Sequence, residues 1–128
     1  MSILSDFIEG SDLNAVTFVM DYSQLQFSSA RLDIFVWPKI SVNDQLLTIE
    51  SPTYEKELHN LIGQVVTSVV ELNESFQGFQ IHFGPGQTLI INPSYDEIVG
   101  PEIMLCRSTE DHQWMVWSDE TRPFGPHD

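Results

Sequence analysis

The chain alternates apolar and polar side chains in the stretch AVTFVMDY, residues 15–22. Val16, Phe18, Met20 and Tyr22 fall on one face, and the residues between them fall on the other. This two-residue period is typical of a strand with one buried face. Residues 65–72 show the same alternation. We therefore expect a strand in each stretch, with its apolar face against a core.

Two short helices are expected, each in front of a strand-rich block. The first spans residues 2–10, with Ser2 as the cap. In the second, Ser51 is suited to the cap, Pro52 to the first helical position and Gly63 to the end. A stripe of apolar residues at helical spacing faces the core from this second helix. The stripe consists of Tyr54, Leu58, Leu61 and Ile62.

The two strand-rich blocks are alike in sequence, which suggests an internal duplication. Both follow the order helix, strand, strand, strand, and two copies are too few for a solenoid. We therefore expect one domain over residues 1–118, built from pseudo-duplicated halves at about 1–50 and 51–118. The matching segments are 16–21 with 66–71, 24–27 with 80–83, and 32–38 with 87–93.

The elements together predict the α+β class. Further strands are expected at residues 46–49, 103–106 and 114–117. Because about eight strands and two helices leave no room for repeated strand-helix-strand crossovers, the sheet should be mostly antiparallel. The pattern leaves open whether the sheet is curled or split into two layers. Residues 119–128 read as a flexible tail.

Charge is the strongest feature of the composition. Nineteen acidic residues oppose five basic ones, and the formal net charge is −14. This charge disfavours binding to nucleic acid and to anionic lipid, and no apolar run is long enough to cross a bilayer. A basic protein partner is therefore expected, although the charge could also serve solubility alone. The residues predicted to bind this partner are Glu71, Glu74, Asp96, Glu97, Glu102 and Trp114.

The sequence has no motif that indicates catalysis, a metal or a cofactor. Nucleotide-binding glycine loops, nucleophile elbows and zinc-binding histidine spacings are absent. The single cysteine, Cys106, allows no intrachain disulfide and lies in an apolar stretch typical of an inert thiol. We expect a protein without catalytic residues, metal or cofactor. The first residues lack the features of a secretory signal, which favours a cytoplasmic location.

Two other functions are compatible with the pattern. One is a small-molecule-binding or enzymatic domain with a pocket between the two halves, where Asp21, Glu71 and His82 would meet. Paired carboxylates support acid–base chemistry, and a histidine titrates near neutral pH. Strand-end acids also mark the solvent boundary, so the pair has a plain structural reading as well. The other function is a homo-oligomer assembled through strand edges or a tryptophan-bearing face.

Residues 55–118 carry a resemblance to a protein family. The features are LIGQVV (61–66) leading into alternating strands, a glycine-containing turn before residues 89–91, and the closing WMVW (114–117). In these features the chain resembles small acidic bacterial proteins of unknown function that are associated with toxin–immunity systems. The resemblance implies a stoichiometric inhibitor of a toxin domain, and it assigns no functional residues. A non-enzymatic, immunity-type inhibitor of a basic protein is therefore our leading expectation.

Overall fold

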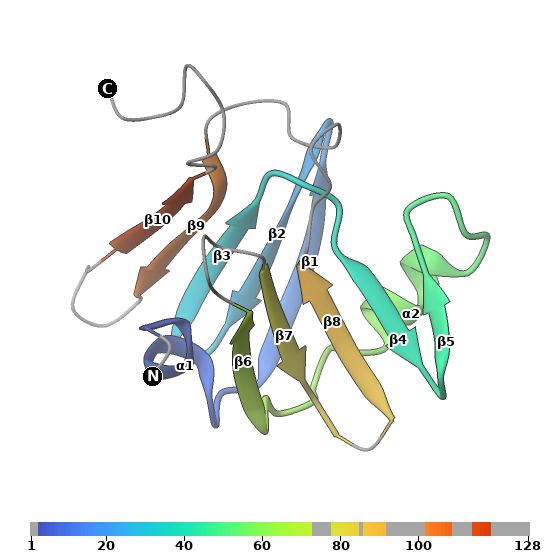
Figure 1. The fold of residues 1–128 in the computed structure, drawn as a ribbon, viewed down its shortest axis with the longest axis horizontal. Coiled ribbons are helices and arrows are strands. Elements are labelled where there is room, and N and C mark those ends of the chain that lie inside the picture. The colour runs from blue at the N-terminus through green and yellow to red at the C-terminus, as the bar shows by residue number, and fades with distance from the viewer. Residues whose placement is uncertain (1–2, 73–77, 85, 92–101, 109–113, 119–128) are drawn as a thin grey trace.

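A computed structural model describes residues 3–72, 78–84, 86–91, 102–108 and 114–118. Within these residues the chain forms two helices and ten strands (Figure 1). The helices are α1 (Ile3–Ile8) and α2 (Tyr54–His59). The first five strands are β1 (Leu13–Val19), β2 (Tyr22–Phe27), β3 (Ala30–Ile34), β4 (Lys39–Val42) and β5 (Gln45–Leu47). The other five are β6 (Ser68–Leu72), β7 (Gly78–His82), β8 (Gln87–Ile91), β9 (Glu102–Ser108) and β10 (Trp114–Ser118).

The strands form two five-stranded sheets. The first has the order β1-β2-β3-β9-β10, and the second has the order β5-β4-β8-β7-β6. All the pairings between these strands are antiparallel. The predicted α+β class with mostly antiparallel sheet is thus confirmed, and the strands lie in two layers (Figure 1). No helix among the described residues is long and apolar enough to span a membrane.

The predicted order of helix, strand, strand, strand occurs twice along the chain. It appears as α1-β1-β2-β3 and again as α2-β6-β7-β8, and a hairpin follows each time. Each hairpin joins the sheet of the other half: β4 pairs with β8, and β9 pairs with β3. Each sheet therefore contains three consecutive strands from one half and two strands from the other.

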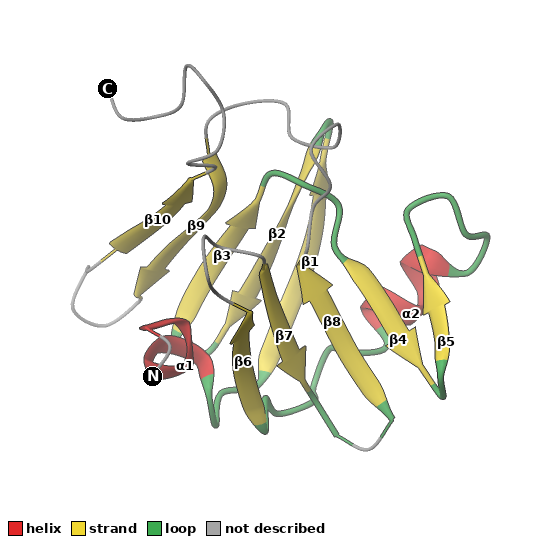
Figure 2. Ribbon diagram, viewed as in Figure 1, coloured by secondary structure: helices red, strands yellow, loops and turns green. Residues whose placement is uncertain are grey.

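A single apolar core connects the two sheets and both helices. Leu4 and Ile8 from α1 and Leu58 from α2 are fully buried in it. Between the sheets, the ring of Phe27 in β2 stacks on that of Phe83 after β7, with centroids 6.5 Å apart. Complete burial of one such side chain contributes about 1.5–3 kcal/mol. Figure 2 shows the helices at the margins, where α1 packs near β6 and α2 near β4 and β1.

The stretch at residues 15–22 differs from its prediction. β1 ends at Val19, and β2 begins at Tyr22, which pairs directly with Val19. Met20 and Asp21 form the turn between them, with Met20 at a positive φ of 23°. The predicted inward position of Met20 is therefore wrong, because its side chain lies in the turn and is 97% exposed. Two-residue turns of this kind join antiparallel strands.

The second helix is shorter than predicted. It begins at Tyr54 and not at Pro52, because the Ser51 side chain belongs to the preceding turn, where its hydroxyl oxygen accepts a hydrogen bond from the Thr48 N–H at 2.9 Å. It ends at His59, before Gly63. The predicted apolar stripe is correct at Tyr54, Leu58 and Leu61, all of them buried. Ile62 is wrong as a core residue: it lies beyond the helix end and is 39% exposed.

Two strands, β4 and β6, also differ from what the sequence analysis predicted. The segment at 39–42 was not predicted, yet it forms β4, a central part of the second sheet. The strand predicted at 65–72 begins only at Ser68, since Val65 makes an isolated bridge with Asp12. The predicted tail, residues 119–128, lies outside the described residues.

Candidate functional site

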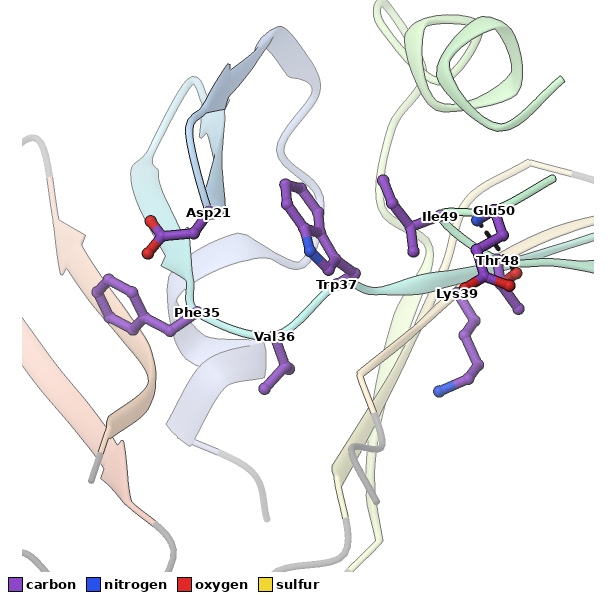
Figure 3. Close-up of a pocket in the computed structure, with 8 residues that line it drawn as sticks. All are labelled: Asp21, Phe35, Val36, Trp37, Lys39, Thr48, Ile49 and Glu50. Carbon is purple, nitrogen blue, oxygen red and sulfur yellow. Dashed lines mark hydrogen bonds between the residues drawn. The ribbon is translucent and has the colours of Figure 1, made fainter. Parts of the chain in front are cut away.

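A cavity of about 320 Å³ opens where the chain crosses from the first sheet to the second. Three segments form it: the turn between β1 and β2, the connection between β3 and β4 together with the first residue of β4, and the residues after β5 (Figure 3). β4 pairs with β5 and with β8, and these pairings fix the position of the residues that follow β5. The lining residues are Asp21, Phe35, Val36, Trp37, Lys39, Thr48, Ile49 and Glu50.

An aromatic cluster supports the cavity from behind. Phe18 in β1 stacks on the indole of Trp37, with ring centroids 5.9 Å apart and an angle of 25° between the planes. On its other sides Phe18 stacks on His59 at 6.1 Å and meets the edge of Tyr54 at 6.3 Å. Aromatic pairs in these geometries add about 0.5–1.5 kcal/mol beyond area burial. The Trp37 ring is therefore supported by Phe18 of β1, which is itself packed against Tyr54 and His59 of α2.

The backbone next to Trp37 is also fixed. The Tyr54 hydroxyl donates a hydrogen bond to the carbonyl oxygen of Pro38 over 2.6 Å. Tyr54 is only 1% exposed, and burial raises the pKa of its hydroxyl above the usual range, so that the donor proton is retained. This bond joins α2 to the connection that carries Trp37.

Two carboxylates lie at the opening of the cavity. Asp21 extends from the β1–β2 turn on one side of Trp37, and Glu50 follows β5 on the other side (Figure 3). Both residues are exposed. The Glu50 backbone N–H donates to the Thr48 hydroxyl at 3.4 Å, which orders the turn after β5. The side chain of Lys39 also lines the cavity and points away from the indole ring (Figure 3).

The arrangement combines an apolar floor with a mostly acidic opening. Phe35, Val36, Trp37 and Ile49 supply the apolar surface. An apolar pocket with a few placed charged groups is the usual form of a binding site, in which the charges orient the ligand. The cavity is therefore suited to a group that has an apolar body and a positive end.

A second cavity, of about 330 Å³, lies at one end of the second sheet. His82 faces away from its buried neighbours Ile81 and Phe83. The Nδ1 atom of His82 and the hydroxyl of Thr88 on β8 are 3.1 Å apart. The lining is mainly polar, and it consists of Ser41, Asn43, Asp44, His82, Phe83, Gly84, Gly86, Gln87 and Thr88.

The three residues of the alternative pocket prediction are not brought together. Asp21 lines the first cavity and His82 lines the second. Glu71 lies in β6 opposite Phe79 and lines neither of them. Neither of these two cavities therefore combines the three side chains.

The residues predicted to bind a partner are spread over both sheets. Glu71 is half-buried in the second sheet. In the first sheet, Trp114 pairs with Arg107 at one end of the β9–β10 hairpin, while Glu102 pairs with Ser118 at the other. Glu74, Asp96 and Glu97 lie outside the described residues.

Among the residues that the structure describes, no three His, Cys, Asp or Glu side chains lie close enough to hold a metal ion. Cys106 is buried in β9, and burial raises the pKa of its thiol to about 12. A thiol that stays protonated is a poor nucleophile. Comparison of the chain with protein-family models, curated proteins and solved structures finds no match.

The sequence predictions missed most of the first cavity. Trp37, Phe35, Ile49 and Glu50 were not among the predicted site residues. The available signal was Trp37-Pro38 directly after an apolar strand, because proline ends a strand and directs the chain elsewhere. The cavity itself depends on β4, the strand that was not predicted.

Proposed function

We propose that this chain is a non-enzymatic binding domain that docks a basic protein partner. The observation that carries the proposal is the formal charge of −14, with nineteen acidic residues against five basic ones. A stoichiometric inhibitor of the immunity type is the form of this function that the resemblance in residues 55–118 suggests.

The negative charge of the chain would act mainly on the rate at which the two proteins meet. A negative potential attracts a positively charged protein over distances beyond the contact range and speeds the encounter. Salt screens this attraction, with a Debye length of about 8 Å at physiological ionic strength. Association with the partner should therefore slow markedly as salt is added.

The surface around the first cavity is the candidate docking site. Exposed apolar side chains stand directly beside its carboxylates: Met20, 97% exposed, precedes Asp21, and Ile49, 39% exposed, precedes Glu50. Apolar anchors surrounded by charged residues are typical of protein interfaces, where the anchors supply most of the affinity. The acidic groups select a partner of opposite charge.

The test is isolation of a partner from lysate of the source cells, followed by affinity measurements with the two purified proteins. We expect a stoichiometric complex with a basic protein, whose association rate falls at least tenfold between low and high salt. Neutralisation by Asp21→Asn with Glu50→Gln should weaken it more than the matched control, Asp6→Asn with Glu55→Gln, which removes the same charge from exposed positions that line neither cavity. Failure to form a salt-dependent complex with any basic protein contradicts the proposal.

A second candidate function is small-molecule binding at the cavity around His82. The contact between His82 and Thr88 and the polar lining favour it, because such groups orient a polar ligand. A ligand that binds only the folded chain raises its melting temperature. A thermal-shift screen should therefore yield polar ligands whose effect disappears in His82→Ala, and a screen without such ligands removes this candidate.

A further inference from the structure

We propose that the cavity around Trp37 receives one arginine side chain of the basic partner, with its guanidinium group over the indole and between the carboxylates of Asp21 and Glu50. The inference rests on the proposed function, and it names the chemical group that the site recognises. It follows from the size of the cavity, its aromatic surface and its charges.

The size of the cavity favours one side chain over a peptide segment. Its volume of about 320 Å³ lies at the lower end of the range of roughly 300–1,000 Å³ that is usual for ligand pockets. Its walls come from three short segments around the β3–β4 connection (Figure 3). A cavity of this volume accommodates one long side chain of a partner.

The apolar surface favours a ligand with an aliphatic stem and a flat charged end. Trp37 is half-buried and is supported by Phe18 at 5.9 Å, so the indole is already ordered before a ligand arrives. Tryptophan is the best aromatic partner for a cation. Guanidinium is planar and weakly hydrated, and it stacks on aromatic rings better than the compact ammonium of lysine does. Ile49 and Phe35 offer contact to the methylene groups.

The carboxylates supply the charge complementarity. Asp21 and Glu50 line the cavity on opposite sides of Trp37, and the Asp21 carboxylate is directed toward the Phe35 side (Figure 3). Guanidinium can bind carboxylates through paired N–H donors, which a lysine ammonium cannot do in the same geometry. Because both carboxylates are exposed, their main effect should be on selectivity for arginine, with a modest gain in affinity.

Lys39 is the opposing charge in this site. Two carboxylates and one ammonium line the cavity, so the lining carries one net negative charge. This charge favours a cationic ligand over an anionic one. Removal of the lysine charge should strengthen arginine binding, whereas a site for an anion would respond in the opposite direction.

The test is an NMR titration of the intact chain with N-acetyl-arginine amide, observed at the assigned indole N–H of Trp37. N-acetyl-citrulline amide, a neutral molecule of nearly the same shape, is the matched control ligand. We expect saturable shifts at Trp37 with arginine, and binding at least tenfold weaker with citrulline. Equal affinity for the two probes, or shifts that avoid Trp37, would overturn the inference.

Variants at exposed positions make the test independent of folding defects. Asp21→Asn and Glu50→Gln should each weaken arginine binding about threefold or more, and Lys39→Gln should strengthen it about twofold. The paired control Asp6→Asn with Glu55→Gln, at exposed positions that line neither cavity, should change it little. Weaker arginine binding in Lys39→Gln, or no response to Asp21→Asn and Glu50→Gln, argues against the site.

The two proposals can fail separately. If a basic partner binds in a salt-dependent manner but the arginine probe does not reach Trp37, only the arginine site is wrong. If the probe binds selectively and no basic partner forms a complex, the arginine site stands and the proposed protein partner is removed.

Discussion

Tyr54 and Pro38 are joined across the two halves of the chain by a 2.6 Å hydrogen bond from the tyrosine hydroxyl to the proline carbonyl oxygen. Tyr54→Phe removes the donor and leaves a buried carbonyl group unpaired. We expect the free energy of unfolding to fall by about 1–3 kcal/mol. Urea denaturation measures it, and Tyr22→Phe, at a half-buried tyrosine outside this contact, is the control. Equal losses in the two variants would show that the hydrogen bond has no special effect.

Leu58 and Ile62 test the position of the helix end. Leu58 is fully buried, and Ile62 is 39% exposed beyond α2. Leu58→Ala should lower the free energy of unfolding by about 2–5 kcal/mol, because it leaves a cavity in the core. Ile62→Ala should change it by less than about 0.5 kcal/mol. Chemical denaturation of both variants checks this difference, and a large loss in Ile62→Ala would place that side chain in the core.

Ser23 and Ser11 are two buried serines with opposite expected effects. The Ser23 hydroxyl has no hydrogen-bond partner among the described residues, whereas the Ser11 hydroxyl accepts the Ser29 N–H at 3.1 Å. Ser23→Ala should raise the melting temperature, because it removes an unpaired buried polar group. Ser11→Ala should lower stability by about 1–3 kcal/mol, because it leaves the N–H unpaired. Calorimetry measures the melting temperatures of both variants. A fall in stability for Ser23→Ala would indicate that the Ser23 hydroxyl has a hydrogen-bond partner.

Cys106 should react slowly in the folded chain. Burial raises the pKa of its thiol to about 12, so very little reactive thiolate is present near pH 8. A disulfide reagent should label the native chain at least a hundredfold more slowly than the chain in denaturant. Because the folded pKa lies above the unfolded value, this group favours the folded state below pH 9.0 and loses that contribution as pH rises toward 12. Rapid labelling of the native chain would contradict the burial.

Local patterns in the sequence predicted most of the elements. Alternation in the strands and helical spacing at Tyr54, Leu58 and Leu61 reflect burial of one face, which side-chain chemistry determines directly. β4 was missed because its four residues, Lys39–Val42, are too few to show a period. The turn at Met20 was missed because it lacks the glycine or asparagine that usually marks such a turn.

Pairing between distant strands was beyond the reach of these patterns. Alternation identifies which face of a strand is buried, but not which strand lies beside it, so the pairing of β3 with β9 could not be predicted. For the same reason, the sequence could not show which side chains share a cavity. Asp21 lines the first cavity, whereas its supposed neighbours Glu71 and His82 do not line it. Glu50 lines the same cavity as Asp21 and Trp37 because the chain crosses to the second sheet at β4 and β5.

The pairing of β3 with β9 has a consequence for synthesis on the ribosome. Ala30–Ile34 is made early, yet its partner strand Glu102–Ser108 emerges some seventy residues later. Until then β3 remains an open edge with unpaired backbone groups, which is the kind of surface that attracts other nascent chains. Newly made protein should therefore be most prone to aggregation during this interval, and translation speed over the last third of the message should affect the yield of folded protein.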